Sequence, residues 1–266
     1  MSDTVNTAET LLLEEVGDGV LIITLNRPSA ANALNLSMSN ALAGIFAGLA
    51  AEPGRYRCLV LTGAGERVFC AGADLKEREA LAGQEAEAQY LAIAGAIRAV
   101  LDSPLPIIAA VNGAAYAGGL ELALSCDFAY AAETARLALT EVSIGIMPGG
   151  GGTQLLPRIA GERRAKEVIL AAQPFSAEEA RDWGIVNRVC RAGQVVAEAV
   201  ETARRIARHP ALPVSQARTA IHTGLQMDLG SGLQFEREAY RRLLTSDARK
   251  EGLSAFKEKR APQFDG

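Results

Sequence analysis

Histidine and cysteine are scarce in this sequence, and their scarcity excludes several kinds of site. Among 266 residues there are only two histidines, His209 and His222. They offer little material for a catalytic triad or a zinc site, so we expect no metal and assign both to structural or surface roles. The four cysteines are scattered, without a C-x-x-C pair: Cys58, Cys70, Cys126 and Cys190. We therefore expect reduced thiols in a cytoplasmic compartment, not a disulfide framework.

Long apolar runs and an N-terminal positive charge are also missing. No uninterrupted apolar run approaches the roughly 20 residues of a membrane-spanning helix. Residues 1–15 contain no lysine or arginine, so they resemble neither a secretory signal nor a transit peptide. The formal net charge of −4 gives no general attraction to nucleic acid or to an anionic membrane. We expect a soluble protein without an export signal.

The sequence does contain enough apolar residues for a large core, with 49% hydrophobic and 22% charged residues. Three short apolar runs predict buried strands: residues 20–25, 58–62 and 106–111. Three alanine-rich stretches with helical spacing predict helices packed on a sheet: residues 36–51, 88–101 and 119–126. The predicted fold class is α/β.

The pattern changes after about Val189, where strand-like runs stop. Three helical stretches follow, with a break marked by Pro210 and Pro213: residues 192–209, 213–225 and 231–244. We accordingly predict a catalytic core over residues 1–195 and a helical region over residues 196–266. Ser176 and Glu179 have the spacing of a capping box, which marks a helix start and not chemistry.

A glycine turn precedes a predicted helix start at Gly72-Ala73-Asp74. Asp74 is the natural N-cap, with Glu77 three residues later, so we interpret the pair as a capping box that satisfies backbone donors. The functional interest lies in the backbone. A free N–H at Ala73, just before a helix, favours negative charge, and Gly72 removes side-chain bulk from the approach.

A second segment repeats this arrangement of strand, glycine turn and helix start, and it includes Gly118-Gly119-Leu120-Glu121. Gly118 offers another free N–H. Two such donors converging on one oxygen form an oxyanion hole, although a single glycine pair is more often an ordinary turn or helix-packing site.

Two glutamates lie in apolar stretches beside glycine clusters. Glu121 follows Gly118-Gly119, and Glu141 precedes Pro148-Gly149-Gly150-Gly151-Gly152. An arbitrary glutamate is usually a surface or ion-paired residue. Apolar neighbours on both sides predict burial and a raised pKa here, which suits acid and base chemistry. Ile144 to Pro148 could line an apolar pocket, although core packing explains that segment equally well.

Several of these motifs, in this order, resemble the crotonase (enoyl-CoA hydratase/isomerase) superfamily. The matching segments span nearly the whole chain: Asn26-Arg27-Pro28, Ala71 to Glu77, Asn112-Gly113, Gly118 to Glu121, Glu141, Pro148 to Gln154, and the tail Glu251 to Arg260. The resemblance implies a spiral of strand-strand-helix turns and a C-terminal helical region that mediates trimers, commonly paired into hexamers. It places Ala73 and Gly118 in the oxyanion hole for an acyl-CoA thioester, with Glu121 and Glu141 as the catalytic pair.

The resemblance also implies a set of contacts with coenzyme A (CoA), which is part of the substrate and not a separate cofactor. The expected contacts are Ser29, Ala30, Ala31, Ala71, Gly72, Asp74, Leu75, Gly149, Phe256 and Lys259. Many relatives carry lysine where this chain has Ser29, so we expect one phosphate contact to be missing or supplied by another residue. Lys257, Lys259 and Arg260 could equally form a solvated basic tail.

Hydration of a 2-enoyl-CoA is the reaction that this resemblance favours, because two intact glutamates can divide the two proton transfers. Δ3-Δ2 enoyl-CoA isomerisation, which needs one carboxylate, is the main alternative, and a non-catalytic assembly role is a third. Within the superfamily the likeness is greatest to methylglutaconyl-CoA hydratases that also bind AU-rich RNA. RNA binding is disfavoured, because residues 36–51 lack lysine and arginine.

Overall fold

The computed structural model describes residues 4–6, 10–51 and 53–264. Residues 1–15, in which we expect no export signal, therefore lie partly outside the described residues. The chain forms two compact units, Met1–Ala203 and Arg204–Gly266, and each is described by itself. The functional division that we predict after residue 195 stays a prediction.

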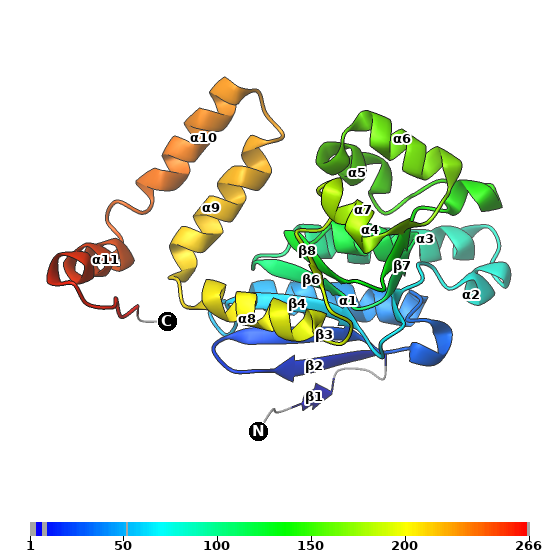
Figure 1. Cartoon of the computed structure of the whole chain (residues 1–266), viewed down its shortest axis with the longest axis horizontal. Coiled ribbons are helices and arrows are strands. Elements are labelled where there is room, and N and C mark those ends of the chain that lie inside the picture. The colour runs from blue at the N-terminus through cyan, green and yellow to red at the C-terminus, as the bar shows by residue number, and fades with distance from the viewer. Residues whose placement is uncertain (1–3, 7–9, 52, 265–266) are drawn as a thin grey trace. The chain divides into compact units, whose positions relative to one another are not determined.

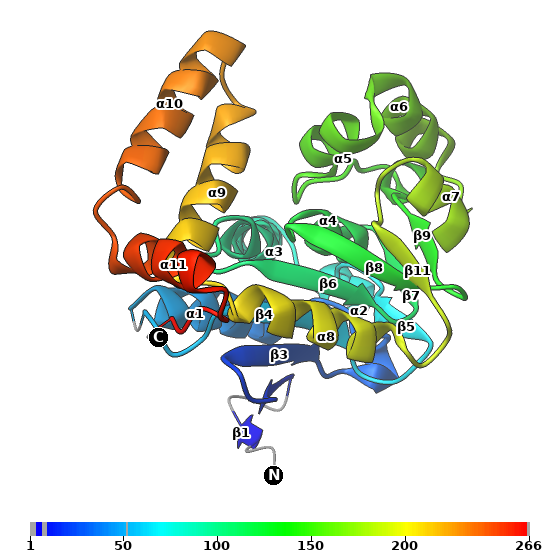
Figure 2. The same ribbon diagram turned by 60° about the vertical axis from the view of Figure 1, so that its left-hand side comes forward.

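Strands of the first unit form two mixed sheets (Figures 1 and 2). The larger sheet has the order β1 (Thr4–Asn6), β2 (Leu11–Glu15), β3 (Val20–Leu25), β4 (Cys58–Gly63), β6 (Ile107–Val111), β8 (Phe128–Ala132) and β11 (Arg188–Cys190). The smaller sheet has the order β10 (Phe175–Ser176), β9 (Arg136–Ala138), β7 (Ala114–Tyr116) and β5 (Val68–Cys70). Strands β1 to β3 pair antiparallel, as do β9 and β10, and the remaining pairs are parallel.

Helices connect and cover these strands. The first unit contains η1 (Pro28–Ala30), α1 (Leu36–Ala51), α2 (Leu75–Glu79), α3 (Gln84–Leu101), α4 (Gly118–Leu124), η2 (Glu141–Ile144), α5 (Gly152–Ala160), α6 (Glu162–Ala171) and α7 (Ala177–Asp182). Helix α8 (Val195–Ala207) continues into the second unit, which contains α9 (Ala211–Gly224), α10 (Leu229–Arg241) and α11 (Asp247–Glu258). No helix of the described residues is long and apolar enough to cross a membrane.

The order of the elements confirms the predicted spiral. Three successive turns of the chain, β4–β5, β6–β7 and β8–β9, each give one strand to the larger sheet and the next to the smaller one, and each is followed by a helix. The chain therefore repeats one step from the larger sheet to the smaller one. The ends of corresponding strands, and the helix starts that follow them, are brought to the same side of the molecule.

Burial explains why the three apolar runs were recognisable as strands. Every residue of β4 and β6 is buried, as expected for parallel strands that are covered on both faces. Helices α1 and α3 pack against each other, and Met38, Leu42 and Phe46 of α1 enter the core. The predictions for these segments are confirmed, with α3 starting at Gln84 rather than residue 88.

Other local predictions have mixed outcomes. The capping box at Ser176 and Glu179 is confirmed. All four cysteines are buried and none forms a disulfide bond. Burial raises the pKa of Cys58 and of Cys70 to about 12, so both thiols stay protonated. Both histidines are exposed. The break in the C-terminal helices lies at Pro210 alone, because Pro213 lies in the first turn of α9, where its missing N–H has no helical partner to lose.

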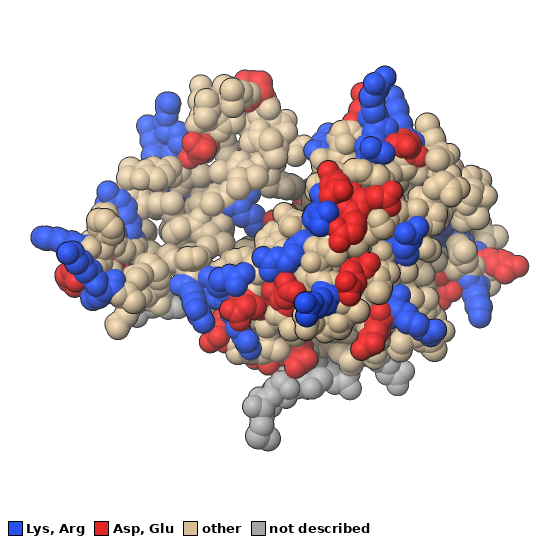
Figure 3. All heavy atoms as spheres, in the orientation of Figure 1, with Lys and Arg blue, Asp and Glu red and all other residues tan. Residues whose placement is uncertain are grey.

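Charged side chains on the surface of the first unit are largely compensated by their neighbours. On the face shown in Figure 3, acidic and basic groups intermingle over α6. There Arg164 pairs with Glu167 and Lys166 with Glu162, at helical spacings of three and four residues. Exposed pairs of this kind contribute little to stability, so α6 presents a solvated, mixed-charge face.

Helix α4 lies between the two sheets, and glycine makes that position possible. The helix contacts β8 of the larger sheet and β5 and β7 of the smaller one. A Cβ atom on Gly119 would lie 2.1 Å from the carbonyl oxygen of Cys70, at the end of β5. Only a residue without a side chain fits there, so the backbone of α4 rests directly on the strand.

This contact predicts a sharp difference between two adjacent substitutions. Gly119→Ala forces backbone to move, and we expect it to lower the free energy of unfolding by about 1–3 kcal/mol or more, although alanine favours helix. At Gly118 the nearest atom to an added Cβ is 3.5 Å away. Gly118→Ala should therefore change stability by less than about 1 kcal/mol. Urea unfolding of both variants and the parent measures this, and equal stability of the two variants would contradict it.

Candidate active site

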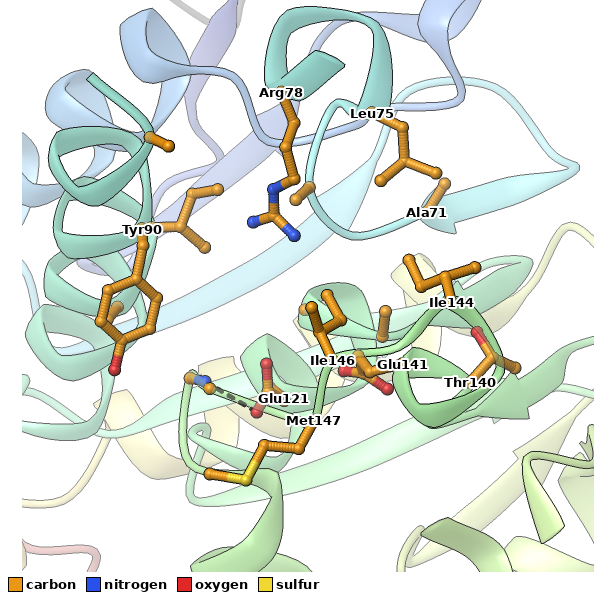
Figure 4. Close-up of a pocket in the computed structure, with 18 residues that line it drawn as sticks. Ala71, Leu75, Arg78, Tyr90, Glu121, Thr140, Glu141, Ile144, Ile146 and Met147 are labelled. Atoms are coloured by element: carbon orange, nitrogen blue, oxygen red, sulfur yellow. Dashed lines mark hydrogen bonds between the residues drawn. The ribbon is translucent and has the colours of Figure 1, made fainter. Parts of the chain in front are cut away.

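A cavity of about 390 Å3 opens where the starts of α2 and α4 meet α3 and η2 (Figure 4). It is lined by Ala71, Ala73, Leu75, Arg78, Ala86, Tyr90, Ile93, Ala94, Ala117, Gly118, Glu121, Thr140, Glu141, Ile144, Ile146, Met147, Gly149 and Gly150. Most of these residues are apolar, and a few polar groups converge on the middle. That composition is typical of small-molecule sites.

One wall of the cavity is the turn that leads into α2. Gly72 has a positive φ of +89°. On one side of Ala73 the Gly72 carbonyl accepts from the N–H of Leu34, and on the other side the N–H of Asp74 donates to the Leu34 carbonyl. The Ala73 N–H itself has no acceptor among the hydrogen bonds of the described residues. It is therefore available to a ligand in the cavity.

The Asp74 carboxylate caps α2, as predicted, but not through a capping box. Its Oδ1 accepts from the N–H groups of Lys76 (3.1 Å) and Glu77 (3.3 Å), and its Oδ2 pairs with Arg27 at 2.9 Å. The Glu77 carboxylate accepts from the N–H of Leu36 instead of reaching back to Asp74. The capping-box prediction is wrong for Glu77, because a tertiary partner on α1 takes its place.

The neighbours of the Asp74 carboxyl also lower its pKa. Burial raises its pKa, but Arg27 and the backbone donors of Glu77 and Lys76 outweigh that effect and hold the pKa below its usual value. Asp74 is thus a structural anion, in agreement with the structural role that we predict for it. It holds the turn that presents Ala73.

The facing wall is the start of α4. Ala117 precedes the helix with φ +50° and ψ −125°, an unfavourable conformation for a residue with a side chain. This conformation turns the Gly118 N–H toward the cavity, and among the described residues that N–H has no acceptor.

The two free N–H groups lie side by side. A Cβ on Gly72 would be 3.0 Å from the Gly118 nitrogen, and a Cβ on Gly118 would be 3.8 Å from the Ala73 nitrogen. Both residues line the same cavity. The structure therefore brings together the two donors that the sequence placed 45 positions apart, in an arrangement that can hold one oxygen atom.

Glu121 lies on α4, one turn after Gly118, and is 3% exposed. Its Oε1 accepts from the N–H groups of Gly150 and Gly152, both at 2.8 Å. Burial raises the pKa of Glu121, while these backbone donors and that of Gly151 oppose the rise because they stabilise the carboxylate.

The glycines around Glu121 are required by space as well as by hydrogen bonding. A Cβ on Gly150 would lie 2.3 Å from Cδ1 of Ile97 and 2.8 Å from Oε2 of Glu121. Gly151 has a φ of +119°, which side chains rarely allow. The glycine run is therefore a cradle for a carboxylate of the chain itself.

Glu141 begins η2 on the other side of the cavity and is 7% exposed. Its Oε2 is buried and has no hydrogen-bond partner among the described residues. Burial raises the pKa of Glu141 to about 7, and the nearby charge of Glu121 adds to the rise, against the effects of its own backbone N–H and of Arg78. This carboxyl therefore holds a proton near neutral pH more readily than an ordinary glutamate.

The residues expected to contact CoA fall into three places. Ala71, Leu75 and Gly149 line the cavity, and Gly72 and Asp74 form the turn beside it. Ser29 and Ala30 lie in η1, and Ala31 ends it with a left-handed φ of +53°. Phe256 and Lys259 belong to the second unit, at the end of α11. These positions show where the ten residues lie, and all ten CoA contacts stay predictions.

Sequence analysis did not single out three polar residues that also line the cavity: Arg78, Tyr90 and Thr140. A signal was present in α2, since Leu75 and Arg78 are three positions apart and so share one helix face. The apolar segment is as expected in part, because Ile144, Ile146 and Met147 line the cavity. No cluster of three or more potential metal ligands occurs among the residues that the structure describes.

Comparisons with known proteins agree with this geometry. Residues 15–266 match the family described as enoyl-CoA hydratase/isomerase. The chain is 42% identical to a putative enoyl-CoA hydratase/isomerase, YngF, of Bacillus subtilis, over 97% of this chain and 99% of that protein. It is 38% identical to the mitochondrial methylglutaconyl-CoA hydratase of Mus musculus, over 96% of this chain and 82% of that protein.

Solved structures give the same result. The crystal structure of an enoyl-CoA hydratase from Bacillus anthracis superposes with a TM-score of 0.94 at 42% identity, covering 97% of this chain and 99% of that one. An enoyl-CoA hydratase structure from Mycobacterium smegmatis reaches 0.90 at 32% identity, covering 96% and 98%. Family model, sequence relatives and fold thus coincide over nearly the full length. The chain belongs to the enoyl-CoA hydratase/isomerase (crotonase) family.

Proposed function

We propose that this protein is an enoyl-CoA hydratase, which adds water across the 2,3 double bond of a 2-enoyl-CoA to give a 3-hydroxyacyl-CoA. The observation that carries the proposal is the presence in one cavity of two free N–H groups and two buried carboxyls in different surroundings. Membership of the family implies an acyl-CoA substrate. The pair of carboxyls supports hydration within that family.

The substrate's thioester oxygen binds to the N–H groups of Ala73 and Gly118. When water attacks C3, the electron pair of the double bond moves onto this oxygen as an enolate. The two donors then face a full negative charge, so they stabilise the transition state more than the substrate. Donors already fixed by the turns at Gly72 and Ala117 need not reorganise during the reaction.

The two glutamates divide the proton transfers. Glu121, whose charged form is stabilised by the N–H groups of Gly150 and Gly152, accepts a proton from the attacking water as the water oxygen bonds to C3. Glu141, whose carboxyl retains a proton near neutral pH, donates it to C2. The carboxyls finish with their protons exchanged, and transfer through solvent resets them. Different environments thus give two identical side chains different roles.

We expect Glu121→Gln and Glu141→Gln each to lower the hydration rate of crotonyl-CoA by about 10²–10⁴-fold, because positioned proton transfer contributes rates of this order. Loss of the conjugated-thioester absorbance measures the reaction. Glu66→Gln, at an exposed loop position, is the matched control and should keep parental activity.

Circular dichroism must first establish that the variants fold. Full activity in either folded glutamine variant would refute the two-glutamate mechanism. A folded parent that converts 3-enoyl-CoA to 2-enoyl-CoA but hydrates nothing would identify an isomerase instead.

The raised pKa of Glu141 also predicts a pH-dependent stability. Between pH 4.5 and about 7 the folded state keeps a proton that the unfolded state has lost, so the free energy of unfolding falls as pH rises through this window. Glu141→Gln has no titrating group at this position, so its free energy of unfolding does not fall in this window for that reason. The variant should therefore match the parent most closely near pH 4.5 and exceed it at pH 8, by up to about 3 kcal/mol. Urea unfolding at several pH values measures the difference, and parallel curves for the two proteins would contradict it.

A homotrimer or a dimer of trimers is the assembly that we propose. Large apolar side chains on the second unit are exposed, among them Ile221, Leu225, Leu229 and Leu233. Clustered exposure of this kind is typical of a surface that another chain covers. Multi-angle light scattering should give about three or six times the chain mass of 27.9 kDa, and a monomeric mass would contradict the proposal.

The remaining elements of the proposal concern CoA and location. We propose that the CoA moiety contacts the residues around Ser29 and Gly72 and the tail at Phe256 and Lys259. We propose a cytoplasmic location, and the four buried cysteines, none of which forms a disulfide bond, support it.

A further inference from the structure

A cation and two carboxyls share the cavity without forming an ion pair. Arg78, half-buried near the end of α2, is the single lysine or arginine among the described residues that line it. In Figure 4 its guanidinium points from α2 into the space above Glu121 and Glu141. Among the described residues, neither glutamate has a carboxylate oxygen within the 4.0 Å of an ion pair with Arg78. Arginine and carboxylate groups attract each other strongly where water is scarce, so a further contact must hold them apart.

The guanidinium is held from behind by Gln89 of α3. Arg78 Nε donates to Oε1 of Gln89 at 3.2 Å, and Gln89 is only 1% exposed. The Gln89 amide donates in turn to Oε2 of Glu77 at 2.7 Å, and the same oxygen accepts from the N–H of Leu36, the first residue of α1. Both polar ends of Gln89 are thus used, and they link α2 to α3 and, through Glu77, to α1.

The chemistry of these contacts explains why a glutamine stands at position 89. Its carbonyl oxygen faces a cation and its amide nitrogen faces an anion, so only one orientation of the amide satisfies both neighbours. A carboxylate there would repel Glu77 and cancel the charge of Arg78. An apolar residue would hold neither. Gln89 is therefore a neutral tether, which fixes the position of the guanidinium and leaves its charge intact.

Few charged or titratable groups face Glu141. Glu121 of α4, Arg78 of α2 and Tyr90 of α3 line the same cavity. Helix α6 also packs against η2, which Glu141 begins. Its charged residues all lie outside the cavity lining that the described residues form: Glu162, Arg163, Arg164, Lys166 and Glu167. Arg78 is therefore the one basic group among the described residues that faces both Glu141 and the reacting atoms.

The charge of Arg78 reaches Glu141 without direct contact. Burial is the main cause that raises the pKa of Glu141, the charge of Glu121 adds to the rise, and the charge of Arg78 opposes it. Proton transfer is most efficient when the pKa of the acid lies near the working pH. A direct ion pair with Arg78 would lower the pKa much further, whereas loss of the positive charge would raise it.

We propose that Gln89 is a positioning residue for hydration, a neutral restraint that keeps the Arg78 guanidinium in the cavity with Glu141 but out of an ion pair with it. A direct ion pair would hold Glu141 as a carboxylate, and so remove the acid that protonates C2. A guanidinium at the observed position favours release of the proton to C2 and still allows a new proton to bind. This inference rests on the proposed function for the role of Glu141.

The competing explanation is that Gln89 serves only to join α2 to α3. Its loss would then lower activity or stability at every pH alike, whether or not Arg78 is present. A restraint on Arg78 instead changes the pH dependence of the reaction, and it has an effect only when Arg78 is there. Removal of the cation and removal of its restraint should also act in opposite directions.

The first experiment measures kcat/KM for hydration of crotonyl-CoA as a function of pH, which reports on groups of the free enzyme. Activity falls on the alkaline side when Glu141 loses its proton. Arg78→Met removes the cation, so this fall should move to higher pH by about 0.5–1 pH unit. Gln89→Met frees the cation to pair with Glu141, so the fall should move to lower pH by about 1 pH unit. Lys76→Met, which removes a positive charge from the exposed face of α2, should leave the profile unchanged.

The double variant Arg78→Met/Gln89→Met is the sharpest test, because coupling between two residues appears as a departure from additivity. If Gln89 acts through Arg78, the double variant should have the pH profile of Arg78→Met alone. Additive shifts, or a Gln89→Met profile displaced to higher pH, would overturn the inference. Gln89→Asn, which shortens the tether by one methylene, is the second variant if the methionine variant does not fold.

The second experiment observes the Glu141 carboxyl without any reaction. Infrared difference spectra follow the carbonyl band of a protonated carboxyl as pH changes, and the band that is absent in Glu141→Gln belongs to Glu141. The pKa of Glu141 should rise in Arg78→Met and fall in Gln89→Met. These opposite changes in a protein that hydrates no enoyl-CoA would refute the proposed function and retain the restraint. Hydration with the same Glu141 pKa in parent and variants would overturn the restraint and leave the proposed function intact.

Discussion

Close contact between the start of α4 and the turn after β5 is the constraint on which the site depends. Gly119 rests on the Cys70 carbonyl, and Gly72 leaves room for the Gly118 nitrogen. Without this approach the N–H groups of Ala73 and Gly118 would not share a cavity. The same contact fixes the direction of α4, and one helical turn later Glu121 lines the same cavity.

Two residues of the cavity are held in states that oppose folding. Among the described residues Glu141 buries an oxygen that has no hydrogen-bond partner, and Ala117 adopts a positive φ. Each feature costs free energy in the unliganded protein. The fully buried strands β4 and β6, and the packing of α1 on α3, offset these costs. Their concentration at one cavity is what distinguishes a working site from a packed core.

The sequence predicted those parts of the fold whose signal is local. Strands β3, β4 and β6 were recognisable because parallel strands covered on both faces are continuously apolar. The smaller sheet was not, because strands of two or three residues, such as β5 and β10, are too short to show a period. The sequence analysis did not predict helices α5 and α6 either. The spiral itself came from the resemblance of motifs, and not from periodicity.

For the candidate site, too, the residues with a local signal were predicted and their tertiary partners were not. Glycine turns and apolar neighbours pointed to Ala73, Gly118, Glu121 and Glu141. The partners that set their chemistry were not visible, because they depend on tertiary contacts. Glu77 has the spacing of a capping residue and instead bonds Leu36 and Gln89. The position of Arg78 in the cavity depends on Gln89, eleven positions later, which accepts a hydrogen bond from its Nε.

Electrostatics links the charged groups of the cavity. Burial is the main cause that raises the pKa of Glu141, and the charge of Glu121 adds to it, while the positive charge of Arg78 opposes the rise. The two glutamates are therefore coupled, because a negative charge on one favours a proton on the other. A pair of carboxyls in one cavity thus tends to divide into one that keeps a proton and one that gives it up.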